Sequence, residues 1–234
     1  MDTSFWNSLN YGIKFKETKK RFWGQYLWRM EIHADCAQVA CYDNTERAVE
    51  LLKLQAQNRS NWGGSWRHKA QADRYDKVDF GLLKSIRTLK ENFVSLTKTR
   101  IEDSNVQFYT KDENDLKSVA KILSTYSCIR AITGPRAGTE ELLCSDVIIA
   151  PKIPFKYKIL LRDGTYDLLL KEQMLNLLES QEDVKLTAGL RHNLKRPYPG
   201  MWGAFFYTND LGVVTMLSLM SPGIVGKIHE VVQA

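Results

Sequence analysis

Alternating apolar and polar positions mark the first strand that the sequence predicts. Over eight residues the apolar side chains recur at every second position, at Tyr26, Trp28, Met30 and Ile32. A period of two over this length is typical of a strand with one face buried. The shorter apolar stretch Val106–Tyr109 predicts a second strand.

Three segments show the helical period of 3.6 instead. Asp43 and Glu46 resemble a capping box, and they predict a helix to about Gln57 with the apolar set Val49, Leu51, Leu52 and Leu54. A second helix places its apolar residues on one face, at Leu82, Leu83, Ile86, Leu89, Phe93 and Leu96. Asp112 is the expected N-cap of a third, whose buried stripe is Leu116, Val119, Ala120, Leu123 and Tyr126.

Residues 156–234 predict the order strand, helix, strand, strand, strand, helix. The first strand is expected at Tyr157–Leu161 and the first helix at Thr165–Ser180. The next strand has Val184, Leu186, Ala188 and Leu190 on one face, and a hairpin follows, made of Met201–Thr208 and Val213–Leu219. The last helix is expected to begin at Ser221 and Pro222, with its inward-facing residues at Val225, Ile228, Val231 and Val232. We expect a split βαβ unit of ferredoxin-like character here.

The mixture of hairpins and helices predicts an α+β protein. We expect three regions: a basic N-terminal α+β half with an extended N-terminal arm at 1–127, a connecting segment at 128–155 and the ferredoxin-like βαβββα unit at 156–234. The segment Phe108–Asp112 resembles Phe206–Asp210, because both begin with Phe-Tyr-Thr and end with Asp. This similarity suggests that the two halves are related copies.

Composition limits the class of protein. The 234 residues are 44% apolar, which is enough for a substantial core. The longest apolar stretch, Leu211–Met220, is interrupted by polar residues, so we expect no membrane span. The first residues lack the pattern of a secretory signal, which predicts an intracellular, cytoplasmic location, with virion association as a variant. The four cysteines are then expected to be reduced and mostly buried.

Charge is distributed unevenly along the chain. The formal net charge is +6. Residues 1–100 contain 18 Lys and Arg against 11 Asp and Glu, whereas the remainder contains 15 against 16. An anionic partner is therefore expected to bind the first half.

Two basic segments of the first half are the main candidates for such a surface. One is the run Lys14, Lys16, Lys19, Lys20 and Arg21, and the other is a loop with Arg59, Trp62, Trp66, Arg67, His68 and Lys69. Cations bind phosphates and indole rings stack on unpaired bases, so this composition is typical of single-stranded nucleic-acid binding. The same residue types are also typical of protein interfaces. A smaller cluster precedes Pro197, at Arg191, His192, Lys195 and Arg196, where a solvated turn is the simpler interpretation.

Motifs for other chemistry are weak. Asp163 and the Asp183-Val184-Lys185 element match the residue types of a metal-dependent nuclease, but such short patterns arise easily by chance. His33, Cys36 and Cys41 lack the spacing of a structural zinc site. The sequence contains neither a phosphate-binding glycine loop of the common types nor a nucleophile elbow.

The sequence therefore predicts a non-enzymatic protein that binds single-stranded RNA or DNA and requires no cofactor. One alternative is a structural or assembly subunit of a viral particle or another large complex, with protein partners or copies of itself. The other alternative is the metal-dependent nuclease.

Overall fold

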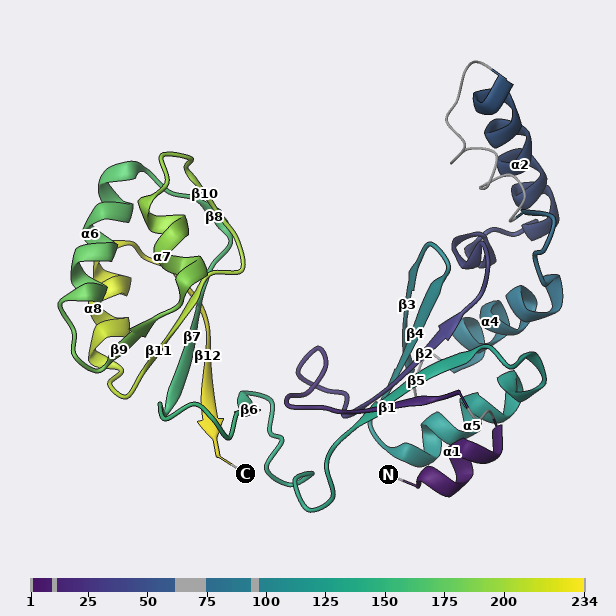
Figure 1. Cartoon of the computed structure of the whole chain (residues 1–234), viewed down its shortest axis with the longest axis horizontal. Helices are drawn as coiled ribbons and strands as arrows, with labels where there is room; N and C mark the ends of the chain where they lie inside the picture. The colour runs from purple at the N-terminus through teal and green to yellow at the C-terminus, as the bar shows by residue number, and fades with distance from the viewer. Residues whose placement is uncertain (1, 10–11, 62–74, 94–96, 234) are drawn as a thin grey trace. The chain divides into compact units, whose positions relative to one another are not determined.

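The computed structural model describes residues 2–9, 12–61, 75–93 and 97–233, with only the backbone described at 59–61. The chain divides into two compact units, Met1–Glu140 (unit 1) and Glu141–Ala234 (unit 2) (Figure 1). Each unit has a five-stranded mixed sheet covered by helices, which confirms the α+β class. Residues 128–155, expected to connect the halves, contain one strand of each sheet.

Unit 1 is built around the strand order β1-β5-β2-β4-β3. Strand β1 is parallel to β5, and the other neighbours are antiparallel. The elements in chain order are α1 (Thr3–Leu9), β1 (Lys14–Glu17), β2 (Trp28–His33), the 3-10 helix η1 (Ala37–Cys41), α2 (Thr45–Asn61), α4 (Phe80–Asn92), β3 (Thr97–Glu102), β4 (Asn105–Thr110), α5 (Glu113–Leu123), η2 (Ser124–Tyr126) and β5 (Ile129–Gly134).

The core of unit 1 lies between its sheet and helices α4 and α5 (Figure 1). The predicted alternation in β2 is confirmed, because Trp28, Met30 and Ile32 are buried and their neighbours are partly exposed. Met30 pairs with Phe108 of β4, which is fully buried. Because side chains alternate across a strand, burial of this face leaves the residues between them on the opposite face of the sheet.

Unit 2 has the strand order β6-β12-β7-β11-β9. Strand β6 is parallel to β12, and the remaining neighbours are antiparallel. Its elements are β6 (Val147–Ile149), β7 (Tyr157–Leu161), β8 (Gly164–Thr165), α6 (Leu168–Glu179), β9 (Val184–Leu186), α7 (Ala188–Lys195), β10 (Gly200–Met201), β11 (Phe205–Thr208), α8 (Gly212–Met220) and β12 (Val225–Val232). Strands β8 and β10 form a separate antiparallel pair.

The two units share one topology. In unit 1 the four strands from β2 to β5 lie in the order fourth, first, third, second, and in unit 2 the strands β7, β9, β11 and β12 lie in that same order. In both units an additional strand earlier in the chain, β1 or β6, runs parallel to the fourth strand. The third strand, β4 or β11, lies between the first and second strands of its sheet.

The repeated Phe-Tyr-Thr sequence occupies the third strand of both sheets. Phe108 and Phe206 are fully buried in the two cores, and so are Thr110 and Thr208. The hydroxyl of Thr110 donates to the backbone oxygen of Asp112 at 2.7 Å, and that of Thr208 donates to the backbone oxygen of Asp210 at 3.0 Å. The five-residue similarity therefore corresponds to the same local structure at the same place in the topology.

The predicted elements after residue 184 are partly wrong. The strand that begins at Val184 ends at Leu186, because the Thr187 side chain caps α7, which takes up Ala188 and Leu190. The segment predicted as the second strand of the hairpin is helix α8, and the segment predicted as the last helix is strand β12. A short apolar run does not distinguish a buried strand from a helix, which explains the exchange.

Helix starts follow the capping rules, with one correction. Asp112 caps α5 as predicted, accepting from the backbone N–H of Asp115 at 2.9 Å. Helix α2 is capped by Asn44 rather than Asp43, since the Asn44 side chain accepts from the backbone N–H of Arg47 at 2.9 Å. Of the apolar set predicted for this helix, Leu51 and Leu54 are exposed.

None of the helices in the described ranges is both long enough and apolar enough to cross a lipid bilayer.

Gly134, at the end of β5, lies against the ring of Trp28. A Cβ atom at this position would lie 2.2 Å from Cζ3 of Trp28, a ring that is itself buried. We expect Gly134→Ala to lower the free energy of unfolding by about 2–3 kcal/mol, because the core cannot accept the added carbon without shifting. Chemical unfolding followed by circular dichroism measures this change.

The control for that substitution is Gly189→Ala in α7, where an added Cβ would have no atom within 4 Å. Alanine is favoured over glycine in a helix by up to about 1 kcal/mol, so this variant is expected to be neutral or slightly more stable. Equal decreases in the two variants would contradict the packing argument.

The buried threonines of the third strands provide a second stability test. Thr110→Val and Thr208→Val keep the shape of the side chain but remove the hydroxyl bonded to the following loop. We expect each to lower the free energy of unfolding by about 1–3 kcal/mol, because a carbonyl is left without its donor. Thr215→Val, on the exposed side of α8, is the control and is expected to have little effect.

Candidate nucleic-acid interface

Most of the predicted tryptophan loop lies outside the described residues. Trp62, Trp66, Arg67, His68 and Lys69 belong to this part of the chain, and the side chain of Arg59 is likewise not described. The structure does extend α2 through Asn61, so the segment predicted as the start of the loop is helical. The role of the two tryptophans stays a prediction.

The predicted lysine run is only partly an independent arm, because its first residues form β1 at the edge of the unit 1 sheet. Lys14 and Lys16 are exposed on this strand, and Lys19 and Lys20 are exposed directly after it. Arg21 is half-buried. Pairing with β5 places Lys16 beside Thr133 and Lys14 beside Ala131.

Strand register brings these lysines into rows that cross the whole sheet. The first row, named here the tyrosine row, runs from β1 to β3 through Lys16, Thr133, Arg29, Tyr109 and Lys98. The row beside it runs through Lys14, Ala131, Glu31, Gln107 and Arg100. Both lie on the face opposite the core, which we call the open face. Together the two rows contain five cationic side chains and one carboxylate.

Glu31 partly neutralises the open face of unit 1. Its carboxylate lies 2.7 Å from Arg29 of its own strand and 3.3 Å from Lys16 of β1, so the second ion pair links β1 to β2 across β5. Arg100 also pairs with Glu102 of its own strand. At the β3 end of the tyrosine row, Lys98 is exposed.

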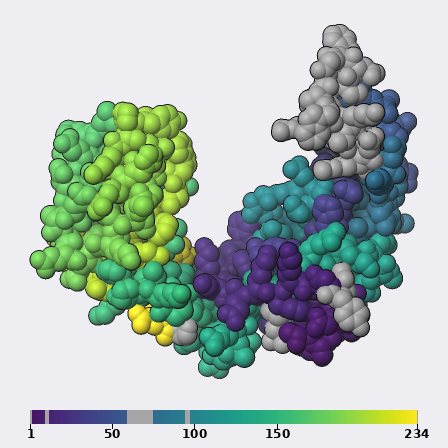
Figure 2. Space-filling view, in the orientation of Figure 1, coloured from purple at the N-terminus to yellow at the C-terminus, as the bar shows by residue number. Residues whose placement is uncertain are grey.

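An aromatic turn between β1 and β2 lies over this face. Trp23 and Gly24 both have positive φ, 56° and 72°, as in a type I′ turn, and the backbone N–H of Gln25 donates to the oxygen of Phe22 at 3.0 Å. A bulky residue at positive φ is strained. Trp23 is 52% exposed, and its ring centroid lies 3.8 Å from Nζ of Lys98. The purple N-terminal segment that contains this turn forms part of the surface of unit 1 (Figure 2).

The aromatic turn covers the tyrosine of the row. Tyr109 is only 3% exposed, because the rings of Phe22, Trp23 and Tyr26 lie 5.4, 6.1 and 6.4 Å from its ring. The guanidinium of Arg29 lies 4.9 Å from the Phe22 ring. Sequence reasoning missed Trp23, although the Phe-Trp-Gly sequence directly after the lysine run signals an aromatic turn.

Unit 2 has a second row at the same place in its own sheet. Register aligns His229, Lys158, Tyr207 and Lys185 across four strands. Nζ of Lys158 lies 3.8 Å from the Phe205 ring, which packs edge-on against Tyr207 at 5.7 Å. Partial burial raises the pKa of the Tyr207 hydroxyl.

The smaller predicted cluster before Pro197 is largely occupied by structural contacts. Arg191 pairs with Glu179 at 3.1 Å, and Arg196 donates to the backbone oxygen of Gly200 at 2.7 Å. Nζ of the buried Lys171 donates to the backbone oxygens of Arg196 and Tyr198, both at 2.9 Å. Burial lowers the pKa of Lys171, with nearby Arg196 as a smaller cause. Lys195 is exposed.

The carboxylates considered for a nuclease do not come together. Asp163 follows the end of β7, whereas Asp183 directly precedes β9. The first residue of β9, Val184, pairs with Thr208, which in turn pairs with Tyr157 at the start of β7. The two lie at opposite ends of the sheet, roughly 20 Å apart at the rise of an extended strand. Oδ1 of Asp163 accepts from the backbone N–H of Gly203 at 2.7 Å, so this residue fixes a turn.

The cysteines do not form a ligand set. Cys36 and Cys128 are buried as expected, but Cys41 and Cys144 are exposed. Burial raises the pKa of Cys128 to about 11. Within the ranges that the structure describes, no group of three or more His, Cys, Asp or Glu side chains is arranged to hold a metal ion.

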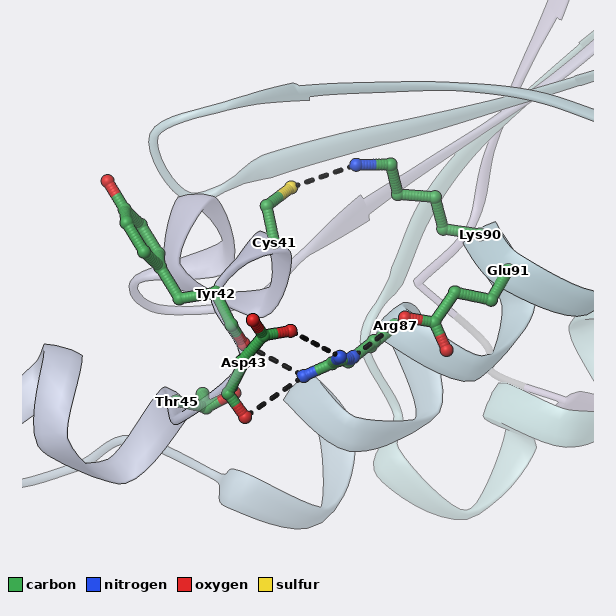
Figure 3. Close-up of polar contacts among 7 residues, drawn as sticks. All are labelled: Cys41, Tyr42, Asp43, Thr45, Arg87, Lys90 and Glu91. Atoms are coloured by element: carbon green, nitrogen blue, oxygen red, sulfur yellow. Dashed lines mark hydrogen bonds and ion pairs between the residues drawn. The ribbon is translucent and has the colours of Figure 1, made fainter.

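The polar side chains around Arg87 form contacts that join helix α4 to the segment before α2. Arg87 donates to Glu91 at 2.8 Å, to the Asp43 carboxylate at 3.0 Å and to the backbone oxygens of Tyr42 and Asp43 at 2.9 and 3.1 Å (Figure 3). Lys90 donates to Sγ of Cys41 at 3.1 Å. These contacts fasten α4 to the segment that leads into α2.

A search of protein-family models, curated proteins and solved structures finds no match to this chain.

Proposed function

We propose that the chain binds single-stranded nucleic acid on the open face of the unit 1 sheet. The observation that carries this proposal is the alignment of Lys16, Arg29 and Lys98 in one cross-strand row, with the exposed indole of Trp23 against Lys98. Cations and an aromatic ring within one surface are the two components that single-strand binding requires.

The cations supply the phosphate contacts. Lys14 and Lys16 line one edge of the face, and Lys98 and Arg100 line the other, so phosphates of a strand lying across the sheet meet positive charge at both edges. Lys19 and Lys20 extend the first edge. Flexible lysine side chains bind phosphates without reading bases, so we expect weak sequence preference.

Trp23 supplies the stacking contact. An exposed tryptophan at positive φ is costly, and such strain concentrates at functional positions. The ring is perpendicular to Tyr109, lies under Nζ of Lys98 and is 6.0 Å from the Arg100 guanidinium, and these contacts limit its motion while 52% of the residue stays exposed. Base stacking on an aromatic side chain contributes about 1–3 kcal/mol.

The topology supports the same function by analogy. We infer that both units are ferredoxin-like, because each has the split βαβ strand order with helices on one face. A common class of RNA-binding module uses an open four-stranded sheet in this way and stacks two or three bases on its aromatic side chains. Fold alone does not establish function, so the proposal depends on the side chains of the open face.

Charge removal at the β3 edge tests the phosphate contacts. We expect Lys98→Gln with Arg100→Gln to weaken binding of a labelled single-stranded oligonucleotide, because two phosphates are left without a cation. The slope of log affinity against log salt is expected to decrease by about 1.4, or about 0.7 per phosphate. Fluorescence anisotropy at several salt concentrations, with RNA and DNA, measures both quantities.

The matched control removes two charges from the helical side of unit 1, with Lys84→Gln and Lys121→Gln, both at exposed positions. It is expected to leave the salt slope nearly unchanged. If the two double variants behave alike, net charge rather than the open face attracts the oligonucleotide. Binding that does not depend on salt, with self-association in sedimentation, would favour an assembly interface instead.

Replacement of Trp23 by Asn separates stacking from folding. Asn tolerates positive φ and is favoured before Gly in type I′ turns, so in Trp23→Asn the relief of backbone strain is expected to offset the lost contact with Tyr109 and to keep the protein folded. Removal of the indole is expected to cost about 1–3 kcal/mol of binding free energy. Unchanged affinity in a folded Trp23→Asn protein would contradict the stacking role.

A further inference from the structure

Unit 2 repeats the tyrosine row at corresponding positions. Thr110 and Thr208 end the repeated Phe-Tyr-Thr sequence and pair with Trp28 and Tyr157, so β2 and β7 align residue by residue. Arg29 then corresponds to Lys158, Tyr109 to Tyr207, and Lys98 to Lys185. In both sheets a tyrosine on the third strand lies between a cation on the first and a lysine on the second.

The row of unit 2 leaves its rings more accessible than the row of unit 1. Tyr207 and Phe205 are only half-buried, whereas Tyr109 lies beneath the aromatic turn. Phe155 approaches Tyr207 from one side, with ring centroids 6.3 Å apart. The lysine-over-ring contact that Lys98 makes with Trp23 is made here by Lys158 with Phe205, at the same 3.8 Å.

Charge on this face also favours an anionic occupant. Lys158 and Lys185 flank Tyr207 directly, and Lys185 is exposed at the sheet edge. Lys227 lies beside Leu160 of the neighbouring row and pairs with Asp146 at 3.1 Å, a hydrogen bond that lowers the pKa of that carboxyl. Half-buried rings flanked by lysines suit stacked bases with phosphates beside them.

We propose that the open face of unit 2 is a second binding site for single-stranded nucleic acid, with Phe205 and Tyr207 as the stacking platform and Lys158 and Lys185 as phosphate contacts. This inference rests on the proposed function of unit 1 for the class of ligand. It adds that one chain binds two short oligonucleotides and that the two faces can be disabled separately.

The test is the number of short oligonucleotides bound by the full chain. Pentanucleotides of uridine and of thymidine are titrated by calorimetry, because a single face is expected to hold only a few bases. The unmodified chain is expected to bind about two per molecule. A unit 1 variant (Trp23→Asn with Lys98→Gln) and a unit 2 variant (Lys158→Gln with Lys185→Gln) are each expected to bind about one.

A control within unit 2 removes the same charge elsewhere, with Arg191→Gln and Lys195→Gln, and is expected to retain two sites. Phe205→Leu, which keeps an apolar side chain on β11, is expected to weaken the unit 2 site about fivefold or more because ring stacking is removed. Circular dichroism detects whether the double lysine variant is destabilised, and in that case Phe205→Leu tests the unit 2 site instead.

The outcomes separate the two proposals. One oligonucleotide per chain, abolished in the unit 1 variant and unaffected in the unit 2 variant, would overturn the second site and leave the first. Binding abolished only in the unit 2 variant would overturn the proposal for unit 1 and keep this one. Absence of binding to either oligonucleotide would overturn both.

Discussion

Burial of one face of each sheet is the constraint on which the rest of the structure depends. Phe108 and Phe206 occupy the centre of the third strand in the two units, and both are fully buried against helices. Because successive side chains point to opposite faces, burying these phenylalanines turns Tyr109 and Tyr207 to the other side. Register with the neighbouring strands then surrounds each tyrosine with cations. The core packing therefore arranges the candidate binding surfaces.

The two units use the same row differently. In unit 1 the aromatic turn lies over Tyr109, so the accessible ring is Trp23, held by a strained backbone and by Lys98. In unit 2 the segment between β6 and β7 places the Phe155 ring 6.3 Å from Tyr207, and Phe205 and Tyr207 remain partly exposed.

The basic residues that the sequence singled out as candidates have separate roles in the structure. Lys14 and Lys16 belong to a sheet edge and point to the open face, whereas Arg196 is engaged by its own turn. The Lys16–Glu31 ion pair shows that a cation of the tyrosine row also links two strands of the sheet. Clustering in sequence is thus a poor guide to shared surface, because strand pairing joins residues that are far apart along the chain.

The sequence by itself determined the α+β class, the strand at Trp28–His33, the helices with a clear stripe and cap, and the similarity of Phe108–Asp112 to Phe206–Asp210. These depend on local periodicity and on side chains that bond to nearby backbone. Only the tertiary structure decided the rows of the open faces, the place of Trp23, and the exchange of helix and strand after Gly212. Register and burial there are set by partners far along the chain, as in the pairing of Val225 with Leu161 or the contact of Lys98 with Trp23, and no local pattern encodes them.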